Sequence, residues 1–268
     1  ACWLGWHGVP VRFAGRVGAH DVDRHRRVFA AHGVQAHLGG DQEQPTGQIV
    51  VLTGSDGRRS MYVSRGANLA LGPTDLPAQL LDGVSWVHVS GYSLFADLSR
   101  QAVLDLLATA SRRGIPWSVD PSSVAFLRTA GAGAFTTWTA GAAVCLPNLA
   151  EALALVGAEG AAGSTVDAAR EAAQQLCTHY TTVAVTCGAH GVVVAAAGTP
   201  ALHRPAVTAP LVDSTGAGDA FTAGFLARWV QSSELVPDLT SAAEAGLATA
   251  ALALGRMGGR PPAVGDLT

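Results

Sequence analysis

Short apolar runs alternate with amphipathic stretches from Val84 to the end of the chain. This alternation predicts the strands of a mostly parallel sheet, separated by helices that cover both of its faces. It is typical of the α/β fold class. The predicted strands are Val84–Val89, Ile115–Val119, Ala143–Leu146, Val183–Thr186 and Val192–Ala195, and the predicted helices are Ala96–Arg113, Leu149–Val156, Thr165–His179, Asp219–Val230 and Leu239–Leu254.

The region before Val84 has a different pattern. Two runs with high β-propensity, Gln48–Thr53 and Arg59–Ser64, flank the turn sequence Gly54-Ser55-Asp56-Gly57. Glycine and aspartate in such a turn predict a β-hairpin. The hairpin either stands apart from the sheet as a small β lid, within about residues 37–66, or forms an antiparallel pair at the edge of the same sheet. The sequence alone leaves both arrangements open.

The composition predicts one folded domain over residues 1–268. Apolar residues make up 49% of the chain and charged residues 14%, which supplies a buried core and excludes a disordered chain. No unbroken apolar run reaches membrane-spanning length, and the start lacks the basic and apolar regions of a signal peptide. The net charge of −3 gives no basic field for nucleic acid or an anionic membrane. We expect a soluble protein.

The distribution of reactive residue types narrows the chemistry further. All 17 cationic side chains are arginine, so a phosphate-binding loop or a Schiff base that depends on lysine is excluded. The nine histidines form no metal-ligand pair. We therefore expect no transition-metal site, and reduced thiols in a cytoplasmic protein. The cysteines lie far apart, at Cys2, Cys145, Cys177 and Cys187.

The strongest candidate site is the segment from Asp213 to Asp219, Asp-Ser-Thr-Gly-Ala-Gly-Asp, which precedes a predicted helix. Small residues allow a sharp turn that brings backbone N–H groups close to a ligand, and the helix dipole at that end favours an anion. Asp219 beside such an anion site indicates a chemical role. The alternative is that Asp219 only caps the helix.

Two more segments follow predicted strands. Asn148 and Glu151 lie one helical turn apart after the strand that Pro147 ends, so they either face a ligand crevice or form a helix capping box. The glycine-rich segment from Thr186 to Gly191 either lets the backbone approach a ligand or makes a tight turn between two strands. Taken singly, each is explained well by its local structural role.

Taken together, these three segments resemble the ribokinase-like sugar kinases, also called the phosphofructokinase-B group. The similarity extends from about Gly15 to Pro261, and Asp213–Phe221 is its most specific part. It implies a ribokinase-like fold and an ATP-dependent enzyme that phosphorylates a hydroxyl of a small sugar or sugar acid. Minor matches are Gly15-Arg16-Val17-Gly18, Pro45-Thr46-Gly47, Arg65-Gly66-Ala67-Asn68, Ser90-Gly91 and Asp120-Pro121.

The resemblance implies a role for each part of the strongest segment. Asp219 is expected to be the general base that takes the proton of the sugar hydroxyl. The backbone N–H groups of Gly216, Ala217 and Gly218 are expected to bind the transferring phosphoryl group. Phosphoryl transfer depends mainly on positioning and charge stabilisation, which backbone donors and a helix dipole provide without lysine.

The resemblance also implies ATP and metal contacts. Asn148 and Glu151 are expected to organise the water shell of Mg²⁺ and, with Thr186, Gly188 and Gly191, to line the nucleotide site.

Further expectations concern a monovalent cation and a second subunit. Asp213 and the carbonyl of Thr215, together with the loop around Met257–Gly259, are expected to hold K⁺ behind the phosphoryl site. The hairpin is expected to cover the sugar as a lid and to pair two chains into a homodimer.

Two residues near the hairpin are candidates for substrate contacts. Arg65 and Asn68, just after the hairpin, are candidates for contacts to a substrate carboxylate or hydroxyl, although Arg65 fits a solvated surface charge equally well. A nucleoside kinase of the same fold is the first alternative function.

The chain also departs from the family pattern at its start. Members usually begin with a strand carrying a Gly-Asp…Asp motif, followed by a sugar-binding Gly-Gly…Asn motif, whereas Gly39-Gly40 comes too late in this chain. We interpret the sequence as lacking that first strand because it is incomplete at its start. If the protein itself lacks the strand, a non-catalytic ligand-binding or regulatory relative is the second alternative.

Overall fold

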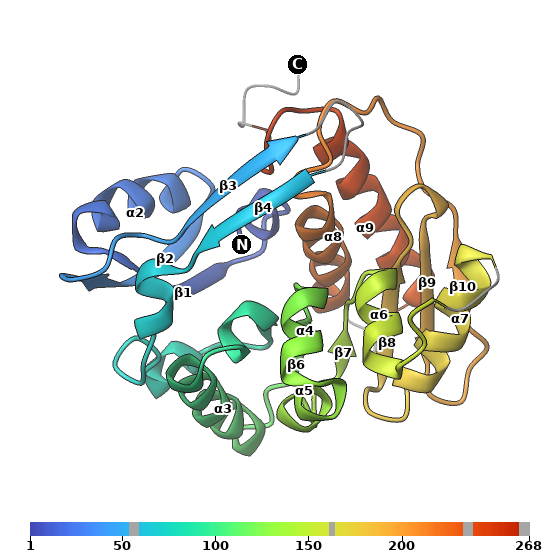
Figure 1. Cartoon of the computed structure of the whole chain (residues 1–268), viewed down its shortest axis with the longest axis horizontal. Helices are drawn as coiled ribbons and strands as arrows, with labels where there is room; N and C mark the ends of the chain where they lie inside the picture. The colour runs from blue at the N-terminus through green and yellow to red at the C-terminus, as the bar shows by residue number, and fades with distance from the viewer. Residues whose placement is uncertain (54–58, 161–163, 233–237, 263–268) are drawn as a thin grey trace.

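Valine- and alanine-rich strands form the centre of the molecule, with helices packed around them (Figure 1). The structure is a computed structural model and describes residues 1–53, 59–160, 164–232 and 238–262. The described strands are β1 Val11–Gly18, β2 Val34–Asp41, β3 Gln48–Thr53, β4 Arg59–Ser64, β5 Val87–Ser90, β6 Trp117–Asp120, β7 Val144–Cys145, β8 Thr182–Thr186, β9 Val192–Ala196 and β10 Leu202–Arg204.

The helices follow the predicted alternation in the second half of the chain. Short 3₁₀ turns η1 to η5 occupy Ala19–Asp21, Gly66–Ala70, Ala78–Leu81, Gly91–Leu94 and Gly188–His190. The described α-helices are α1 Cys2–Trp6, α2 Val22–Ala30, α3 Asp97–Arg112, α4 Val124–Ala130, α5 Ala132–Trp138, α6 Leu149–Val156, α7 Thr165–Leu176, α8 Ala217–Gln231 and α9 Leu239–Leu254.

The main sheet has the strand order β10-β9-β8-β7-β6-β5. Strands β5 to β8 are parallel, and β9 runs antiparallel to both β8 and β10. Both faces are buried, because Val183 and Val185 of β8 pack into the core cluster beneath α3, α6 and α7, whereas Ala184 packs against α8 and α9. The prediction of a mostly parallel sheet between two helical layers is confirmed. The carboxyl ends of β5 to β8 share one edge, where ligands bind in such folds.

The first part of the chain forms separate sheets. Strands β1 and β2 pair in parallel, and β3 and β4 pair as an antiparallel hairpin, called the lid hairpin below. In the part of the chain that the structure describes, neither pair joins the six-stranded sheet, so the alternative of an edge pair on that sheet is wrong. The hairpin strands match the predicted ranges, and the predicted turn at 54–57 lies outside the described residues. Residues 37–41, expected within the lid, belong to β2.

Several element boundaries differ from the predictions. Strand β5 begins three residues later than expected, and α7 ends at Leu176 rather than His179. Helices α4 and α5 were not predicted, because glycine and threonine within 129–137 lower helix propensity. Within the described residues, no helix combines the length and the apolar character required to cross a bilayer.

Candidate active site

The start of α8 forms a tight backbone turn against a neighbouring loop. Gly216 caps the helix with a φ of 78°, in the left-handed region that glycine tolerates best. A Cβ at Gly216 would lie 2.6 Å from the Cα of Gly259, so the two backbones meet with no room for a side chain. Position 216 therefore has no side chain because two loops touch here. This reason is independent of any contact with a ligand.

This turn leaves backbone donors without acceptors. Ala217 donates its N–H to the carbonyl of Ser214 at 3.3 Å, whereas the N–H groups of Gly216 and Gly218 donate to no group in the described part of the chain. A Cβ placed on Gly218 would meet nothing within 4 Å, so the space beside it is open. Open donors at the N-terminus of a 15-residue helix favour a bound anion. Of the three expected donors, Ala217 is the one already engaged.

Asp219 lies in the first turn of α8, directly after these donors. Its side chain reaches solvent, but surrounding protein atoms partly desolvate the carboxyl and raise its pKa. A carboxylate with a raised pKa is a better proton acceptor than an ordinary aspartate. Asp219 accepts no N-cap hydrogen bond, because Gly216 occupies the cap position. The alternative that Asp219 caps the helix is therefore wrong.

Asn148 and Glu151 form the capping box that the sequence offered as one of two interpretations. The Oδ1 of Asn148 accepts from the N–H of Glu151 at 3.0 Å, and the Oε2 of Glu151 accepts from the N–H of Asn148 at 3.0 Å. Burial and, to a lesser extent, the negative charge of Asp120 raise the pKa of Glu151 to about 7. A capping glutamate gains nothing from such burial, so the capping box does not account for its whole environment.

Asp120 is the residue whose importance sequence reasoning missed. Burial raises its pKa to about 6, with a further contribution from the charge of Asp219. Its Oδ1 accepts the N–H of Ser122 at 2.7 Å, and Ser122 has a φ of 67°, the one positive φ outside glycine among the described residues. The available signal was Asp120-Pro121 at the end of a predicted strand, which appeared only as a minor match. The charge of Asp120 thus acts on Glu151, and the charge of Asp219 acts on Asp120, which relates both carboxylates to Asp120 at the sheet edge.

The glycine-rich segment after β8 lies beside Asn148. Thr186 and Asn148 form an isolated parallel bridge, and Thr186 donates its N–H to the carbonyl of Pro147 at 3.0 Å. Gly191 has a φ of 90°, and a Cβ there would lie 2.0 Å from the carbonyl oxygen of Arg204. Gly188 also has a positive φ, of 56°. The turn is therefore a tight strand connection, and it brings the Thr186 and Asn148 segments together.

A family model and similar proteins place this arrangement among known enzymes. The model of the pfkB family of carbohydrate kinases matches residues 1–264. The chain belongs to this family. A fructokinase from Klebsiella pneumoniae is 33% identical over 257 residues, which cover 89% of this chain and 80% of the relative. The resemblance to carbohydrate kinases inferred from the motifs is confirmed, and the protein is an ATP-dependent carbohydrate kinase.

Solved structures support the fold. A probable sugar kinase from Rhizobium etli CFN 42 has a TM-score of 0.85 at 26% identity, covering 97% of this chain and 76% of that one. An adenosine kinase from Sinorhizobium meliloti has a TM-score of 0.86 at 24% identity, covering 97% of this chain and 77% of that one. The ribokinase-like fold is therefore confirmed. The second likeness concerns the fold alone, because sugar and nucleoside kinases share it.

Asp213 connects the segment from Asp213 to Asp219 with the 257–259 loop, which is expected to form part of the cation site. Its Oδ1 accepts from the N–H of Thr215 at 2.9 Å and from the Thr215 hydroxyl at 2.8 Å. Its Oδ2 accepts from the N–H of Gly258 at 3.0 Å. The carboxylate thus stabilises its own turn and also joins that turn to the 257–259 loop. The K⁺ site itself stays a prediction.

The two substrate candidates lie at the base of the lid hairpin. The guanidinium of Arg65 donates to the carbonyls of Tyr92 at 2.7 Å and Phe95 at 3.1 Å, and lies over the Phe126 ring, 5.5 Å from its centroid. Arg65 is therefore not a freely solvated charge. Asn68 has an exposed side chain close to Gly47, where an added Cβ would lie 2.4 Å from its Nδ2. Contact of either residue with a sugar stays a prediction.

Proposed function

We propose that this kinase transfers the γ-phosphoryl group of ATP to a hydroxyl of a small sugar or sugar acid, with Asp219 as the general base. The supporting observation is the position of Asp219 directly after the open N–H donors of Gly216 and Gly218. In the reaction, the substrate oxygen bonds to the γ-phosphorus, the bond from that phosphorus to the ADP oxygen breaks, and the hydroxyl proton moves to Asp219. ADP leaves with the electron pair of the broken bond.

The chain's own groups supply two separate contributions to this step. The N–H groups of Gly216, Ala217 and Gly218 bind the phosphoryl oxygens, and each well-placed donor accelerates such a step by about 10²–10³. To donate, Ala217 gives up its long hydrogen bond to Ser214. Asp219 contributes about 10²–10⁴ as a positioned base. Its raised pKa suits it to accept a proton near neutral pH.

Glu151 and Asn148 would hold Mg²⁺ through water molecules. In the described part of the chain, no cluster of three or more histidine, cysteine or acidic side chains is close enough to ligate an ion directly, which is consistent with coordination through water. The donor chemistry fits, because Mg²⁺ prefers oxygen ligands and keeps several waters. A cation here would also favour the charged forms of Glu151 and Asp120, whose pKa values are raised by burial and, less strongly, by a neighbouring carboxylate. When bound, the ion neutralises charge on the phosphates of ATP.

Thr186, Gly188 and Gly191 would line the nucleotide site beside Asn148. The bridge between Thr186 and Asn148 supports this assignment, because it places the proposed metal and nucleotide segments next to each other. Asp213 and Thr215 would contribute to a K⁺ site that stiffens the turn from Gly216 to Gly218.

The lid hairpin would cover the sugar and pair two chains, with Arg65 and Asn68 contacting the substrate at its base. Directly opposed residues on β3 and β4 share a face. One face carries Ile49, Val51, Met61 and Val63, and the other carries Val50, Leu52 and Tyr62, all exposed in a single chain. Two apolar faces fit two occupants, a sugar site on one side and a second copy on the other.

We further assign residues 1–268 to one kinase domain with this lid, acting in the cytoplasm. All four cysteines are free, which fits a reducing compartment.

A substrate panel tests the proposed function. Purified protein is incubated with ATP, Mg²⁺ and hexoses, pentoses, sugar acids, sugar phosphates or nucleosides, and ADP release is measured for each, with Asp219→Asn as the matched inactive control. Release above the control with a sugar or sugar acid is the expected result. Release only with a nucleoside indicates a nucleoside kinase, and no release with any compound indicates a non-catalytic relative.

A further inference from the structure

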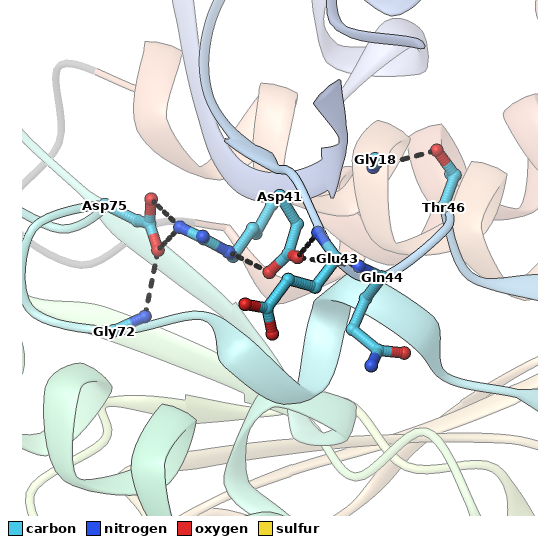
Figure 2. Close-up of polar contacts among 8 residues, drawn as sticks. Gly18, Asp41, Glu43, Gln44, Thr46, Gly72 and Asp75 are labelled. Carbon is cyan, nitrogen blue, oxygen red and sulfur yellow. Dashed lines mark hydrogen bonds and ion pairs between the residues drawn. The ribbon is translucent and has the colours of Figure 1, made fainter. Parts of the chain in front are cut away.

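Arg16 of β1 binds two carboxylates that are far apart in the sequence. Its Nε lies 3.0 Å from the Oδ2 of Asp41, and one terminal nitrogen lies 3.1 Å and 3.2 Å from the two carboxylate oxygens of Asp75. Figure 2 shows the side chains of Asp41 and Asp75, with dashed lines for these contacts. We refer to these three residues as the Arg16 network. A planar guanidinium can bind two carboxylates at once because its donors point in fixed, diverging directions.

The Arg16 network is shielded from solvent and completed by backbone donors. The side chains of Asp41 and Asp75 are 8% and 5% exposed, and that of Arg16 is 22% exposed. The Oδ1 of Asp41 accepts the N–H groups of Glu43 and Gln44, and these bonds, with Arg16, hold the pKa of Asp41 below its usual value. Figure 2 also shows the N–H of Gly72 donating to Asp75.

Asp41 and Asp75 lie at the two ends of residues 41–75, which contain the lid hairpin and are called the lid segment below. Asp41 ends β2, and residues 42–47, the entry segment, lead from it to the hairpin. Residues 65–75, the exit segment, lead from the hairpin to Asp75. The amides that the carboxylates bind belong to these same segments, since Glu43 and Gln44 follow Asp41 and Gly72 precedes Asp75. One guanidinium therefore joins both ends of the lid segment to the β1–β2 pair.

Gly39 shows that the backbone is shaped to admit this network. Gly39 pairs with Arg16 across β1 and β2. A Cβ at position 39 would lie 1.9 Å from the Oδ1 of Asp75 and 3.3 Å from a terminal nitrogen of Arg16. A side chain at this position would therefore displace the Asp75 carboxylate. This gives a local reason for a glycine that does not match the family's sugar-binding Gly-Gly motif.

A second contact fixes the entry segment on the same strand. The hydroxyl of Thr46 accepts the N–H of Gly18 at 3.0 Å and donates to Asp21 at 2.5 Å, as Figure 2 shows in part. The exit segment then joins the entry segment through the N–H of Ala67, which donates to the carbonyl of Pro45 at 2.8 Å. Both segments are thus held by polar contacts near the hairpin base.

We propose that Arg16 is a positioning residue for the lid hairpin, which it holds in place before the sugar arrives. The proposal rests on the proposed function in one respect, the role of the hairpin as the sugar lid. Arg16 touches no reacting atom in this scheme. Its loss leaves two buried carboxylates without a counter-charge, and their repulsion separates the two ends of the lid segment. The sugar must then supply the ordering of the lid, so its apparent affinity falls.

Three variants and a matched control test this proposal. Arg16→Met raises the sugar KM about tenfold, which is within the range of interaction energies measured for residues of one network. The kcat stays within about twofold of the wild-type value, because the phosphoryl-transfer groups lie elsewhere. Arg16→Lys has an intermediate KM, since an ammonium cannot hold both carboxylates in the same geometry. Adding Asp75→Asn to Arg16→Met partly restores the wild-type KM, because it removes one of the two unpaired charges. Arg12→Met is the control: Arg12 lies on the same strand and binds the carbonyls of Leu80 and Asp82, outside the lid segment.

Deuterium uptake on ligand-free protein separates failure of this proposal from failure of the proposed function, because it needs no turnover. Arg16→Met speeds exchange at the amides of Glu43, Gln44 and Gly72, and leaves exchange in β8 and β9 unchanged. Unchanged exchange at these three amides overturns the proposal. It is equally overturned if exchange speeds up while the sugar KM stays at the wild-type value, or if Arg12→Met raises KM as much as Arg16→Met. If wild type phosphorylates no sugar in the panel, the proposed function fails while the exchange result still decides whether Arg16 holds the lid.

Discussion

The six-stranded sheet and the lid segment are held in place by different forces. The sheet at whose edge Asp120, the Thr186 segment and the helix with Glu151 lie rests on fully buried side chains, such as those of Val183, Val185 and Val192. The lid hairpin buries almost nothing, with Val50 at 57% and Tyr62 at 64% exposure, and its ends are fixed by the Arg16 network. Apolar packing is non-directional, and many contacts together make a close-packed core resist deformation. An ion network depends on a few charged groups, so the loss of one weakens all its contacts.

This difference predicts that chemistry and sugar binding can be disturbed separately. The phosphoryl-transfer groups lie where the backbone is set by the core, so substitutions there change kcat or metal use. The lid segment is set by polar contacts and by whatever covers its apolar faces, so substitutions there change KM or assembly. Each prediction below tests one side of this division.

The largest effect is expected at the catalytic base. Asp219→Asn should lower kcat at least about 10²-fold, because the substrate hydroxyl loses its proton acceptor. Nucleotide binding and the melting temperature should change little, since the side chain reaches solvent and makes no helix cap. Steady-state kinetics with calorimetric ATP titration measure both effects. A variant with near-wild-type kcat would remove Asp219 from the mechanism.

The next effect concerns the metal. Glu151→Gln should raise the Mg²⁺ concentration for half-maximal rate about tenfold, the lower end of losses seen when a group that orients metal ligands is changed. The amide oxygen can still accept the N–H of Asn148, so the capping box and the fold should persist. If only the sugar KM changed, the pair Asn148 and Glu151 would be a helix cap and no metal site.

The two faces of the lid hairpin give a matched pair of variants. Val50→Asp and Val51→Asp place the same charge on opposite faces. One should weaken the dimer at least about tenfold by burying an unpaired charge, and the other should raise the sugar KM while the dimer persists. Sedimentation velocity and steady-state kinetics distinguish them. A wild-type protein that sediments as a monomer at all accessible concentrations would rule out pairing through the lid.

The sequence predicted the local structure of the sheet-edge motifs and the strands of the lid hairpin, but not the network that holds the lid, for a physical reason. Asp219 and Glu151 belong to short local motifs in which turn, helix start and functional side chain are contiguous. The Arg16 network joins Arg16 to Asp41 and Asp75, which lie 25 and 59 positions further along the chain. Nothing in the local periodicity of the sequence links these residues. The sequence does not indicate a role for Asp120, because its environment depends on the charges of Glu151 in α6 and Asp219 in α8. Contacts of this kind require the fold to be known first.

A smaller effect concerns pH and stability. The pKa of Glu151 is raised to about 7 in the folded protein, whereas the unfolded value is lower, so the folded state holds its proton more tightly. The contribution of Glu151 to the free energy of unfolding should therefore fall as pH rises from below 5 towards 7 and then level off. Glu151→Gln removes this contribution and should be more stable than the wild type at pH 8 by about 3 kcal/mol, since each unit of the rise from 4.5 to about 7 corresponds to roughly 1.4 kcal/mol. Urea unfolding at pH 5 and pH 8 measures the difference, and a stability gap independent of pH would contradict the raised pKa.

The smallest expected effect is that of a monovalent cation, which would act on a turn that hydrogen bonds already hold. Asp213 already holds the turn before α8 through Thr215 and Gly258. A K⁺ ion bound by the Asp213 carboxylate and by nearby carbonyls would further restrict a turn that is already partly fixed. We therefore expect K⁺ to raise kcat only about two- to tenfold, which is less than the contribution of one oriented N–H donor. Asp213→Ala should abolish this stimulation and lower kcat even without K⁺, because the hydrogen bond from Gly258 and those from Thr215 are lost as well. Thr215→Val is the matched comparison: it removes one hydroxyl donor to Asp213 but keeps the backbone carbonyl, so stimulation should persist. Kinetics in K⁺ and in tetramethylammonium at equal ionic strength provide the measurement. Equal rates in both salts would show that the hydrogen bonds of Asp213 suffice to hold the turn, and that no cation takes part.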